Sequence, residues 1–248
     1  MQGIILTGGQ GTRLRPLTDT TNKHLLDICG KPMIHHSLSI LASAGVKDVT
    51  LVSNPHHLDR FREILPDRFG GKFEILRFVP QQDKPGIGGS IQMVPKDIRR
   101  GPFMLVLGDN LLGGSTHDYR DSFEQNPDSA LTLLSKVKSP KAFGVMKIEN
   151  GRAVEIEEKP QNSDSHWAIT GIYFLPSDLF EIASQIKPSA RGEYEVTDIL
   201  AIYLQQNRLE YQKLACWWVD AGTHKSLAQA KRLVSGEING SDKGGYYD

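Results

Sequence analysis

The chain has few cysteines, no long apolar run and no excess of charge of either sign. Its two cysteines, Cys29 and Cys216, lie far apart without C-x-x-C spacing, which argues against a thiolate metal site or a disulfide scaffold. We expect both thiols to be buried or semi-buried. No apolar run approaches the roughly 18 residues that a membrane span needs. No basic-then-apolar signal segment begins the chain, so we expect no membrane partner and a cytoplasmic location.

The charge balance is neutral. The 29 Lys and Arg residues match the 29 Asp and Glu residues, so the formal net charge is zero. No global field would therefore draw the chain to nucleic acid or to an anionic membrane. At 248 residues and 39% hydrophobic content, the chain can form a substantial core. Because no repeat or linker is evident, we predict a single domain over residues 1–236 and a flexible tail over residues 237–248.

Strand and helix signals alternate through the first half of the chain. Such alternation is typical of a parallel sheet covered by helices on both faces. The run at 103–107 is apolar throughout, as a central parallel strand should be. We expect strands at 3–7, 49–52, 73–78 and 103–107, and helices from Pro32 to Gly45, at 56–65 and near 88–94.

After residue 128 the pattern changes to shorter extended pieces, which predicts mixed or antiparallel pairing. Asn150-Gly151 lies between two such pieces and is the strongest hairpin signal in the chain. The predicted fold class is α/β: a Rossmann-like, mostly parallel mixed sheet with helices on both faces, plus a smaller β-rich subregion. We expect strands at 130–137, 144–149, 153–158 and 168–175, and helices at about 177–186, 194–207 and 223–235.

A glycine turn after the first strand is the most informative feature. The segment Gly8-Gly9-Gln10-Gly11-Thr12-Arg13 follows the apolar run Ile4-Ile5-Leu6. Glycines let backbone N–H groups close around an anion, and Arg13 adds a fixed cation. Taken alone, such a turn is more often a tight connection than a ligand site. Matching charged residues elsewhere in the chain favour the phosphate-binding interpretation.

Two familiar glycine patterns do not fit this turn. The dinucleotide pattern G-x-G-x-x-G needs a small residue where Leu14 stands. The Walker pattern needs Gly-Lys-Ser/Thr, whereas Gly11 precedes Thr12-Arg13. A dinucleotide-dependent oxidoreductase is therefore disfavoured.

Two aspartates follow apolar strands. Asp109 comes just after the run at 103–107, at the sheet edge where open α/β folds bind ligands. Asp220 follows Trp217-Trp218-Val219 and precedes a predicted helix. Turn formation and a helix N-terminal acid are the plain alternatives. Because Mg²⁺ takes one or two protein carboxylates plus phosphate oxygens and water, the two aspartates could together hold Mg²⁺ on a triphosphate.

Other segments complete a recognisable series. The glycine turn is followed by Asn22-Lys23-His24-Leu25-Leu26, by Lys31-Pro32-Met33-Ile34 and later by Glu157-Glu158-Lys159-Pro160. This series resembles the sugar-phosphate nucleotidyltransferases, most closely the glucose-1-phosphate thymidylyltransferases in a short form without the C-terminal helical extension. The resemblance covers the chain to about residue 235. It implies a nucleotide-binding part at about 1–128 and a sugar-binding part at about 129–236.

The resemblance implies an activity. A nucleotidyl group would pass from a nucleoside triphosphate to a sugar 1-phosphate, most closely from dTTP to glucose 1-phosphate, by metal-assisted in-line attack on the α-phosphorus. Mg²⁺ would be the cofactor, with Asp109 and Asp220 as its ligands, and the assembly would be a homotetramer. The implied catalytic residues are Arg13, Lys23, Asp109, Lys159 and Asp220.

The resemblance also implies two sets of binding residues. One glutamine would read the base, and a shift of one position would select Gln82 in place of Gln81. The nucleotide set is Leu6, Gly8, Gly9, Gly11, Thr12, Arg13, Gln81, Gly86 and Asp109. The sugar-phosphate set is Asn110, Gly144, Glu158, Lys159, Thr170, Gly171, Tyr173 and Arg191.

One segment departs from the family pattern. The family usually reads G-L/I-A-Q-A where this chain has Gly86-Ile87-Gly88-Gly89-Ser90. The added glycines cost about 1 kcal/mol each in helix propensity and remove a side chain beside the nucleotide. The same chemistry with UTP, GTP or an unusual sugar 1-phosphate therefore stays open. A non-catalytic subunit that binds nucleotide sugars is a further alternative.

Overall fold

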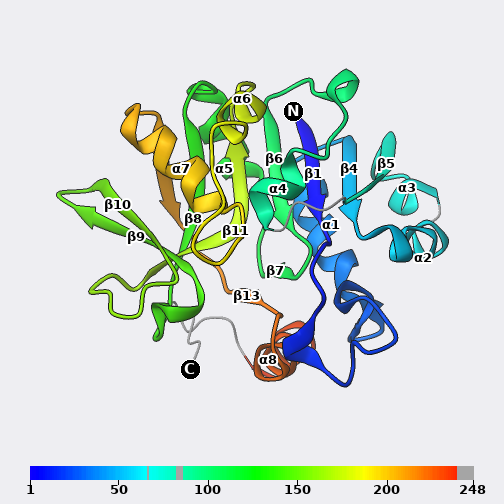
Figure 1. Cartoon of the computed structure of the whole chain (residues 1–248). Coiled ribbons are helices and arrows are strands. Elements are labelled where there is room, and N and C mark those ends of the chain that lie inside the picture. The colour runs from blue at the N-terminus through cyan, green and yellow to red at the C-terminus, as the bar shows by residue number, and fades with distance from the viewer. Residues whose placement is uncertain (66, 82–85, 239–248) are drawn as a thin grey trace.

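The computed structural model describes residues 1–65, 67–81 and 86–238, so the expectations for Gln82 and for tail residues 239–248 lie outside the described residues. Within these residues the main sheet has nine strands (Figure 1). Seven follow the order β10 (Arg152–Glu158), β9 (Gly144–Glu149), β11 (Trp167–Leu175), β6 (Phe103–Leu107), β1 (Gln2–Leu6), β4 (Asp48–Ser53) and β5 (Ile75–Pro80). β8 (Ala130–Lys136) pairs with both β11 and β12 (Leu209–Lys213).

The predicted change from parallel to mixed pairing is confirmed. β1 lies parallel to both β4 and β6, and β4 lies parallel to β5. β11 then runs antiparallel to β6, to β8 and to β9. The predicted hairpin joins β9 to β10, and its turn residues Asn150 and Gly151 both have positive φ, at 49° and 77°. This conformation matches the Asn-Gly preference of tight hairpins.

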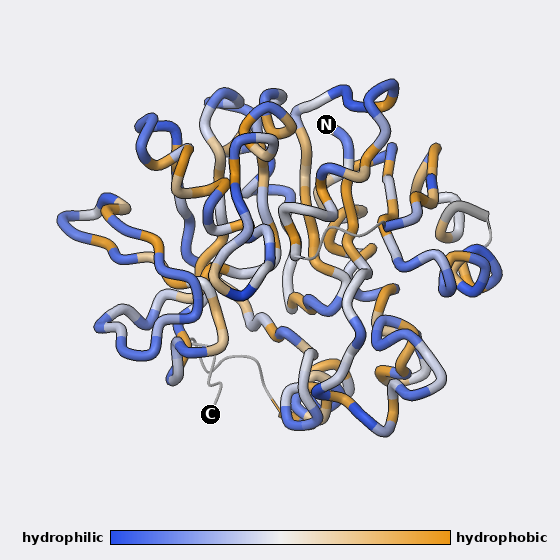
Figure 2. Tube along the Cα trace, in the orientation of Figure 1, coloured by the Kyte–Doolittle hydropathy of each residue, from blue (hydrophilic) through white to orange (hydrophobic). Residues whose placement is uncertain are grey.

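Successive side chains along each central strand point to opposite faces of the sheet, so two cores form, one on each face. Ile5 and Val106 belong to one cluster of buried side chains, and Ile4 and Leu105 belong to the other. Figure 2 shows these central strands as the most hydrophobic part of the chain. Residues of α1 (Met33–Ser43), α2 (Leu58–Ile64), α5 (His117–Gln125) and α8 (His224–Val234) pack in the first cluster. Residues of α4 (Ile87–Ile91), α6 (Leu179–Ala183) and α7 (Val196–Gln205) pack in the second.

Several predicted elements have different bounds. The helix predicted at 56–65 is a 3-10 turn at Pro55–His57 followed by α2, and the one predicted near 88–94 is the five-residue α4. α5 and β12 were not predicted. α5 presents only Tyr119 and Phe123 to the core, which is too few apolar residues for a helical period. The short helix α3 (Asp67–Gly70) was not predicted either.

Two small strand pairs lie outside the main sheet. β2 (Asp27–Ile28) pairs with β3 (Lys31–Pro32), and β7 (Asn110–Leu112) pairs antiparallel with β13 (Trp218–Asp220). β13 leads directly into α8, below the sheet in Figure 1. The second pair therefore brings a segment from the end of the described chain against the end of β6.

The expectation of a buried or semi-buried thiol is wrong for Cys29. It is exposed, has φ 52° in the turn between β2 and β3, and its Sγ donates to the main-chain oxygen of Lys231 at 3.3 Å. Cys216 is half-buried. Free cysteine is usually among the most buried residue types, but the tight turn exposes this one.

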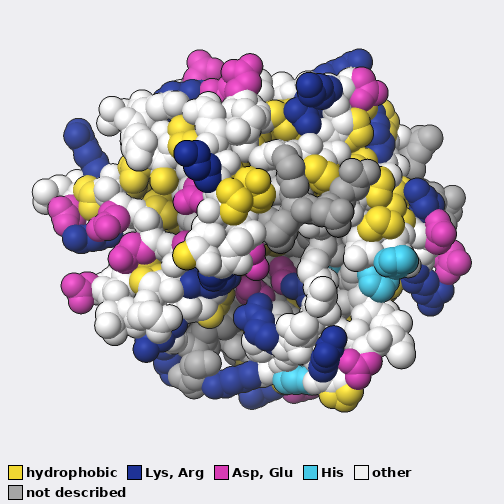
Figure 3. All heavy atoms as spheres, in the orientation of Figure 1, with side chains coloured by type: hydrophobic (Ala, Val, Ile, Leu, Met, Phe, Trp, Pro, Cys, Tyr) yellow, Lys and Arg dark blue, Asp and Glu magenta, His cyan; other side chains and the backbone are white. Residues whose placement is uncertain are grey.

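The surface shows charges of both signs. Acidic and basic side chains are interspersed on the face that Figure 3 displays, in line with equal numbers of basic and acidic residues. In the described part of the chain, no helix combines the length and the apolar character that crossing a membrane requires. Ligand binding on this face therefore depends on local groups of charged residues.

Candidate active site

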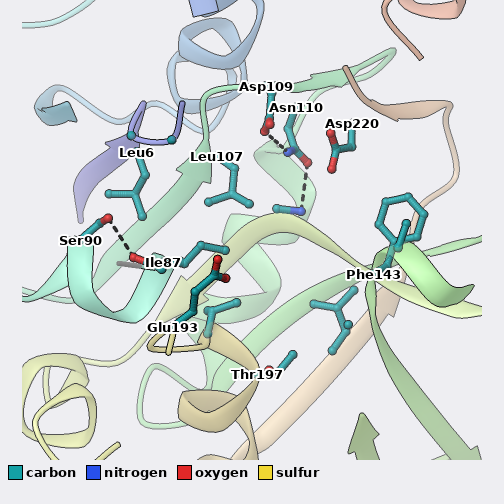
Figure 4. A pocket seen from close by; sticks show the side chains of 18 of the residues that line it. Leu6, Ile87, Ser90, Leu107, Asp109, Asn110, Phe143, Glu193, Thr197 and Asp220 are labelled. Atoms are coloured by element: carbon teal, nitrogen blue, oxygen red, sulfur yellow. Dashed lines mark hydrogen bonds between the residues drawn. The ribbon is translucent and has the colours of Figure 1, made fainter. Parts of the chain in front are cut away.

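A pocket of about 290 Å³ lies at the carboxyl ends of β1 and β6 (Figure 4). Figure 4 shows Asp109, Asn110 and Asp220 on one side of it and Glu193 and Thr197 on the other. Most of the predicted site residues line this pocket: Leu6, Gly8, Gly9, Arg13, Lys23, Gln81, Gly86, Asp109, Asn110, Gly144, Glu158, Lys159, Gly171, Tyr173 and Asp220. Residues to which the sequence analysis assigned no role also line it, among them His24, Glu193 and Thr197.

The glycine turn lies against the predicted base reader. A Cβ added at Gly8 would lie 1.9 Å from Oε1 of Gln81, which shows that the glutamine side chain crosses directly over this glycine. Gly9 and Gly11 have φ of 96° and 64°, in the region that favours glycine. Position 8 is therefore a glycine because of close approach, and positions 9 and 11 because of backbone conformation.

Asp109 is held by the backbone around it. A Cβ at Gly108 would lie 2.7 Å from Cδ2 of His24, so the chain reaches Asp109 through a position that only glycine fits. Ser37 on α1 places its Oγ 2.7 Å from the main-chain oxygen of Gly108 and 2.9 Å from that of Asn110. The sequence analysis missed Ser37. Its available signal was a hydroxyl on the buried face of a helix.

Asn110 ties three segments together. Its Oδ1 accepts hydrogen bonds from the main-chain N–H of Gly171, at 3.0 Å, and from the Trp218 indole. Its Nδ2 donates to Oδ1 of Asp109 at 3.2 Å. The predicted sugar-binding role of Asn110 therefore competes with a structural one, because its amide already binds protein atoms. Trp218 is 2% exposed, so its indole is part of the core.

The pairing of β7 with β13 brings the second aspartate to the first. Asp220 lies directly opposite Asn110 in the register, and the Ala221 N–H donates to the main-chain oxygen of Asp109 at 2.9 Å. Asp220 is thus the last residue of a strand, as the sequence suggested, but this strand lies outside the main sheet. A separate two-stranded ribbon delivers it to the same place.

Three charged side chains converge above Gly222. A Cβ added at this glycine would lie 2.7 Å from Oδ1 of Asp220, 3.0 Å from Nη2 of Arg13 and 3.7 Å from Oδ2 of Asp109. Two carboxylates far apart in the sequence and the cation of the first turn therefore share one small volume. This is the arrangement on which the predicted chemistry depends.

The end of the pocket predicted to bind the sugar is a network around Glu158, the last residue of β10. Its Oε2 accepts a hydrogen bond from the Thr197 hydroxyl at 3.0 Å, and its Oε1 lies 3.4 Å from Nζ of Lys159. Lys159 has φ 45°, which turns the chain sharply after the strand. A Cβ at Gly144 would lie 2.6 Å from Cγ2 of Thr197, so a larger residue would push α7 away.

Arg191 lies beside this network and is not among the residues that line the pocket. Its Nη2 contacts Oε1 of Glu195 at 2.8 Å, Oε1 of Glu158 at 3.1 Å and Oε2 of Glu193 at 3.3 Å. Ser189 also donates to Glu195 at 2.8 Å. A single guanidinium nitrogen thus joins the loop before α7 to the end of β10. Contact with a sugar phosphate would require its side chain to move inward.

The side chain of Thr170 does not face the pocket. Its Oγ1 donates to the main-chain oxygen of Leu133 on β8 at 2.9 Å, whereas its neighbours Ile169 and Gly171 line the pocket. Successive side chains of a strand point to opposite faces. The sugar-binding role predicted for Thr170 is therefore not supported for its side chain.

Gly11 and Thr12 also do not line the pocket. Thr18 donates to the main-chain oxygen of Gly11 at 2.8 Å, and Thr12 is exposed. These two residues shape the turn, while Gly8, Gly9 and Arg13 border the pocket. The predicted direct contacts of Gly11 and Thr12 with nucleotide are not supported by their positions.

Comparisons with known proteins identify the family of this chain. Residues 2–236 match the protein family described as nucleotidyl transferase. The chain belongs to this family. A glucose-1-phosphate thymidylyltransferase of Neisseria meningitidis is 40% identical over 94% of this chain and 82% of the relative. One from Mycobacterium tuberculosis is 37% identical with the same two coverages, 94% and 82%.

Solved structures give the same answer for the fold. A Bacillus anthracis protein assigned as a glucose-1-phosphate thymidylyltransferase, crystallised with a sucrose, superposes with a TM-score of 0.89 at 35% identity, over 100% of both chains. A UDP-glucose pyrophosphorylase complexed with UDP-glucose has a TM-score of 0.83 at 22% identity, over 96% of this chain and 99% of that one. The second comparison shows the fold alone.

The electrostatics of this nucleotidyltransferase separate its two aspartates. Burial, together with repulsion from Asp109, raises the pKa of Asp220 to about 6. Burial would also raise the pKa of Asp109, but the ion pair with Lys23 outweighs burial and holds that pKa well below its usual range. Burial opposes the charge on Lys23, yet attraction to both aspartates prevails and raises the pKa of Lys23. Asp109 and Lys23 therefore form a charged pair beside a less acidic Asp220.

The possible metal ligands of this nucleotidyltransferase suit an ion that prefers oxygen ligands. Among the described residues, no group of three or more His, Cys, Asp or Glu side chains could hold an ion. Two carboxylates without nitrogen or sulfur ligands suit Mg²⁺, which completes its shell with phosphate oxygens and water. Asp109 and Asp220 are the residues that would hold it.

The atypical segment at 86–90 has a packing reason. A Cβ at Gly86, where φ is 90°, would lie 2.5 Å from the main-chain oxygen of Tyr194. The Gly88 N–H donates to that same oxygen at 2.8 Å, and a Cβ at Gly88 would lie 2.5 Å from Cδ1 of Ile186. The start of α4 therefore packs directly on the segment before α7. Ser90 faces the pocket while its Oγ donates to Gly86 at 3.0 Å.

Gly8→Ala is expected to raise the KM for nucleotide about tenfold, because the new methyl group must displace Gln81 at a cost of about 1–2 kcal/mol. The glutamine side chain occupies that position in the wild type. Steady-state kinetics measure the effect. In a Gln81→Ala background the same substitution should add little, because the clash has been removed. Equal effects in both backgrounds would show that Gly8 acts independently of Gln81.

Proposed function

We propose that this enzyme transfers a thymidylyl group from dTTP to glucose 1-phosphate, giving dTDP-glucose and pyrophosphate. The observation that carries the proposal is the convergence of Arg13, Asp109 and Asp220 above Gly222. Residues of the glycine turn and of the Glu158 network line the same pocket as these side chains. The thymidylyltransferases of Neisseria meningitidis and Mycobacterium tuberculosis support the choice of substrates.

The reaction needs positioning more than proton transfer. A sugar-phosphate oxygen, already an anion, forms the new bond to the α-phosphorus, while the bond from that phosphorus to the bridging oxygen breaks. Pyrophosphate leaves on the opposite side with the electron pair. No general base is required, so alignment and charge stabilisation supply the catalysis. Lys159 and Arg191 would aim the nucleophile, and Arg13 with the glycine turn would stabilise the pyrophosphate.

Mg²⁺ is part of the proposal. When bound, it would neutralise charge on the triphosphate, and Asp109 and Asp220 would hold it. The family resemblance also supports a homotetramer, and the lack of signal and membrane-span patterns in this sequence supports a cytoplasmic location. Light scattering of the purified protein tests the tetramer.

A panel of triphosphates tests the choice of base. With glucose 1-phosphate as acceptor, we expect dTTP to give the highest kcat/KM for pyrophosphate release among dTTP, UTP, GTP, CTP and ATP. The departure at residues 86–90 favours one alternative, the same chemistry with UTP, GTP or another sugar 1-phosphate. A clear preference for another triphosphate would establish that alternative. Absence of turnover with every triphosphate and several sugar 1-phosphates would point to a non-catalytic binding subunit.

A further inference from the structure

Lys23 already supplies a cation to the carboxylate that would bind the metal. Its Nζ donates to Oδ2 of Asp109 in an ion pair, and the two side chains are only 14% and 10% exposed. Asp109 Oδ2 is also the oxygen that faces Asp220 and Arg13 above Gly222. An ammonium and a divalent ion on the same carboxylate oxygen repel each other strongly in a poorly solvated site. The ammonium and the divalent ion therefore cannot both bind this oxygen with full affinity.

The side chain of Lys23 also lies within reach of the glycine turn. A Cβ at Gly11 would lie 3.3 Å from Cβ of Lys23, so the lysine is rooted directly beside the glycine turn. Its backbone is fixed, because the preceding Asn22 accepts from the His24 N–H at 2.9 Å and donates to the main-chain oxygen of Thr7 at 3.2 Å. A change of side-chain torsions alone can carry the ammonium from Asp109 toward a phosphate held by the turn.

We propose that Lys23 takes the place of the divalent ion as the counter-charge of Asp109 in the free enzyme, and passes to the triphosphate when metal and nucleotide bind. This inference rests on the metal site of the proposed function. Its consequence is positive coupling: nucleotide removes the competitor of the metal, and metal releases a cation for the nucleotide. By linkage, each ligand strengthens the other by the same factor. Metal without nucleotide should bind weakly.

Mn²⁺ binding to the nucleotide-free enzyme tests the inference without any turnover. Electron paramagnetic resonance of free Mn²⁺ gives the affinity. Lys23→Met, which keeps an unbranched side chain and removes the charged terminal group, should bind Mn²⁺ at least about tenfold more tightly than the wild type. Lys31→Met removes one charge from an exposed lysine outside the pocket and should leave Mn²⁺ affinity unchanged. Adding Asp109→Asn to Lys23→Met should abolish the gain, because the ligand is lost.

Unchanged or weaker Mn²⁺ binding by Lys23→Met would overturn the inference about Lys23 while leaving the metal site intact. Failure of the wild type to bind Mn²⁺ even with dTTP, beyond what dTTP binds in buffer, would overturn the metal site itself. A thermal-shift series on the wild type covers the case in which Lys23→Met does not fold. Mg²⁺ alone should leave Tm nearly unchanged, whereas Mg²⁺ with dTTP should raise it more than dTTP with EDTA. A large shift with Mg²⁺ alone would contradict the inference.

Discussion

Asp220→Asn is expected to lower turnover by on the order of 10²–10³ and, in the absence of metal, to make the protein more stable. In the proposed reaction, activity falls because one of the two carboxylates that would hold the metal on the triphosphate loses its charge. Stability rises because Asp220 is enclosed beside a second carboxylate, and repulsion from Asp109 adds to the cost of burial. Asparagine keeps the side-chain oxygen that accepts from the Gly222 N–H at 2.8 Å.

The sign of the pH dependence distinguishes removal of a buried charge at Asp220 from a general disruption of the fold. The pKa of Asp220 is raised from 3.8 to about 6 in the folded state. Protonated Asp220 therefore stabilises the folded state fully below pH 4, and this stabilisation is lost as the pH rises through 6. The advantage of Asp220→Asn should appear over that range and stay level above it. Its expected size is on the order of 1–3 kcal/mol, after allowance for the solvent-facing side of the pocket.

Thermal unfolding in EDTA at pH 4, 5.5 and 7.5 measures this difference, and steady-state kinetics with Mg²⁺ measure turnover. Asp109→Asn is the contrasting variant. It leaves Lys23 without its main partner and should destabilise the fold, because an unpaired buried charge costs about 3–5 kcal/mol. If Asp220→Asn were as destabilising as Asp109→Asn at pH 7.5, the repulsion between the aspartates would be refuted.

Arg13→Ala is expected to lower kcat by on the order of 10²–10³ with little change in Tm. Arg13 is exposed on its turn, yet its Nη2 lies beside both aspartates above Gly222. In the proposed reaction, the guanidinium would therefore face the negative charge that develops on the departing pyrophosphate. Its loss should affect kcat more than the KM for dTTP, because the contact is strongest in the transition state.

Arg15→Ala is the matched control. Arg15 lies two residues further along the chain, and its Nε contacts Oδ1 of Asp19 at 3.4 Å with its side chain 63% exposed. Exposed pairs of this kind contribute about 0–1 kcal/mol, so kcat and Tm should stay close to wild type. Single-turnover measurements would separate chemistry from product release. Comparable losses in both variants would mean that general positive charge, not the placement of Arg13, serves the reaction.

The arrangement of strands and helices could be predicted from the sequence, because apolar runs and turn residues are local signals of each element. The central strands, the Asn150-Gly151 hairpin and the change to mixed pairing follow from period and turn chemistry. The meeting of Asp109 and Asp220 was also predicted, but for an incomplete reason. The sequence placed each aspartate after an apolar strand, but it did not indicate that the β7–β13 ribbon joins them. Three-residue strands carry too little pattern to be recognised in advance.

The supports of the site could not be predicted because they join distant residues through single atoms. The sequence around Asn110 does not indicate that its side-chain oxygen accepts hydrogen bonds from Gly171 and Trp218. The sequence around Gly8 does not indicate that the Gln81 side chain packs against this glycine. Thr170 is a different case. Alternation along β11 could have excluded its side chain, and the family resemblance was given more weight than that alternation.

The contact between α4 and Tyr194 has a practical consequence for anyone who redesigns this enzyme. It fastens the segment predicted to contact the base to the loop that carries Arg191 and the Glu158 network. Bulkier residues at 86 or 88, introduced to accept a different base, would push that loop and, under the proposed function, would disturb sugar binding. A change of donor and a change of acceptor therefore cannot be engineered independently, and libraries should vary both regions together.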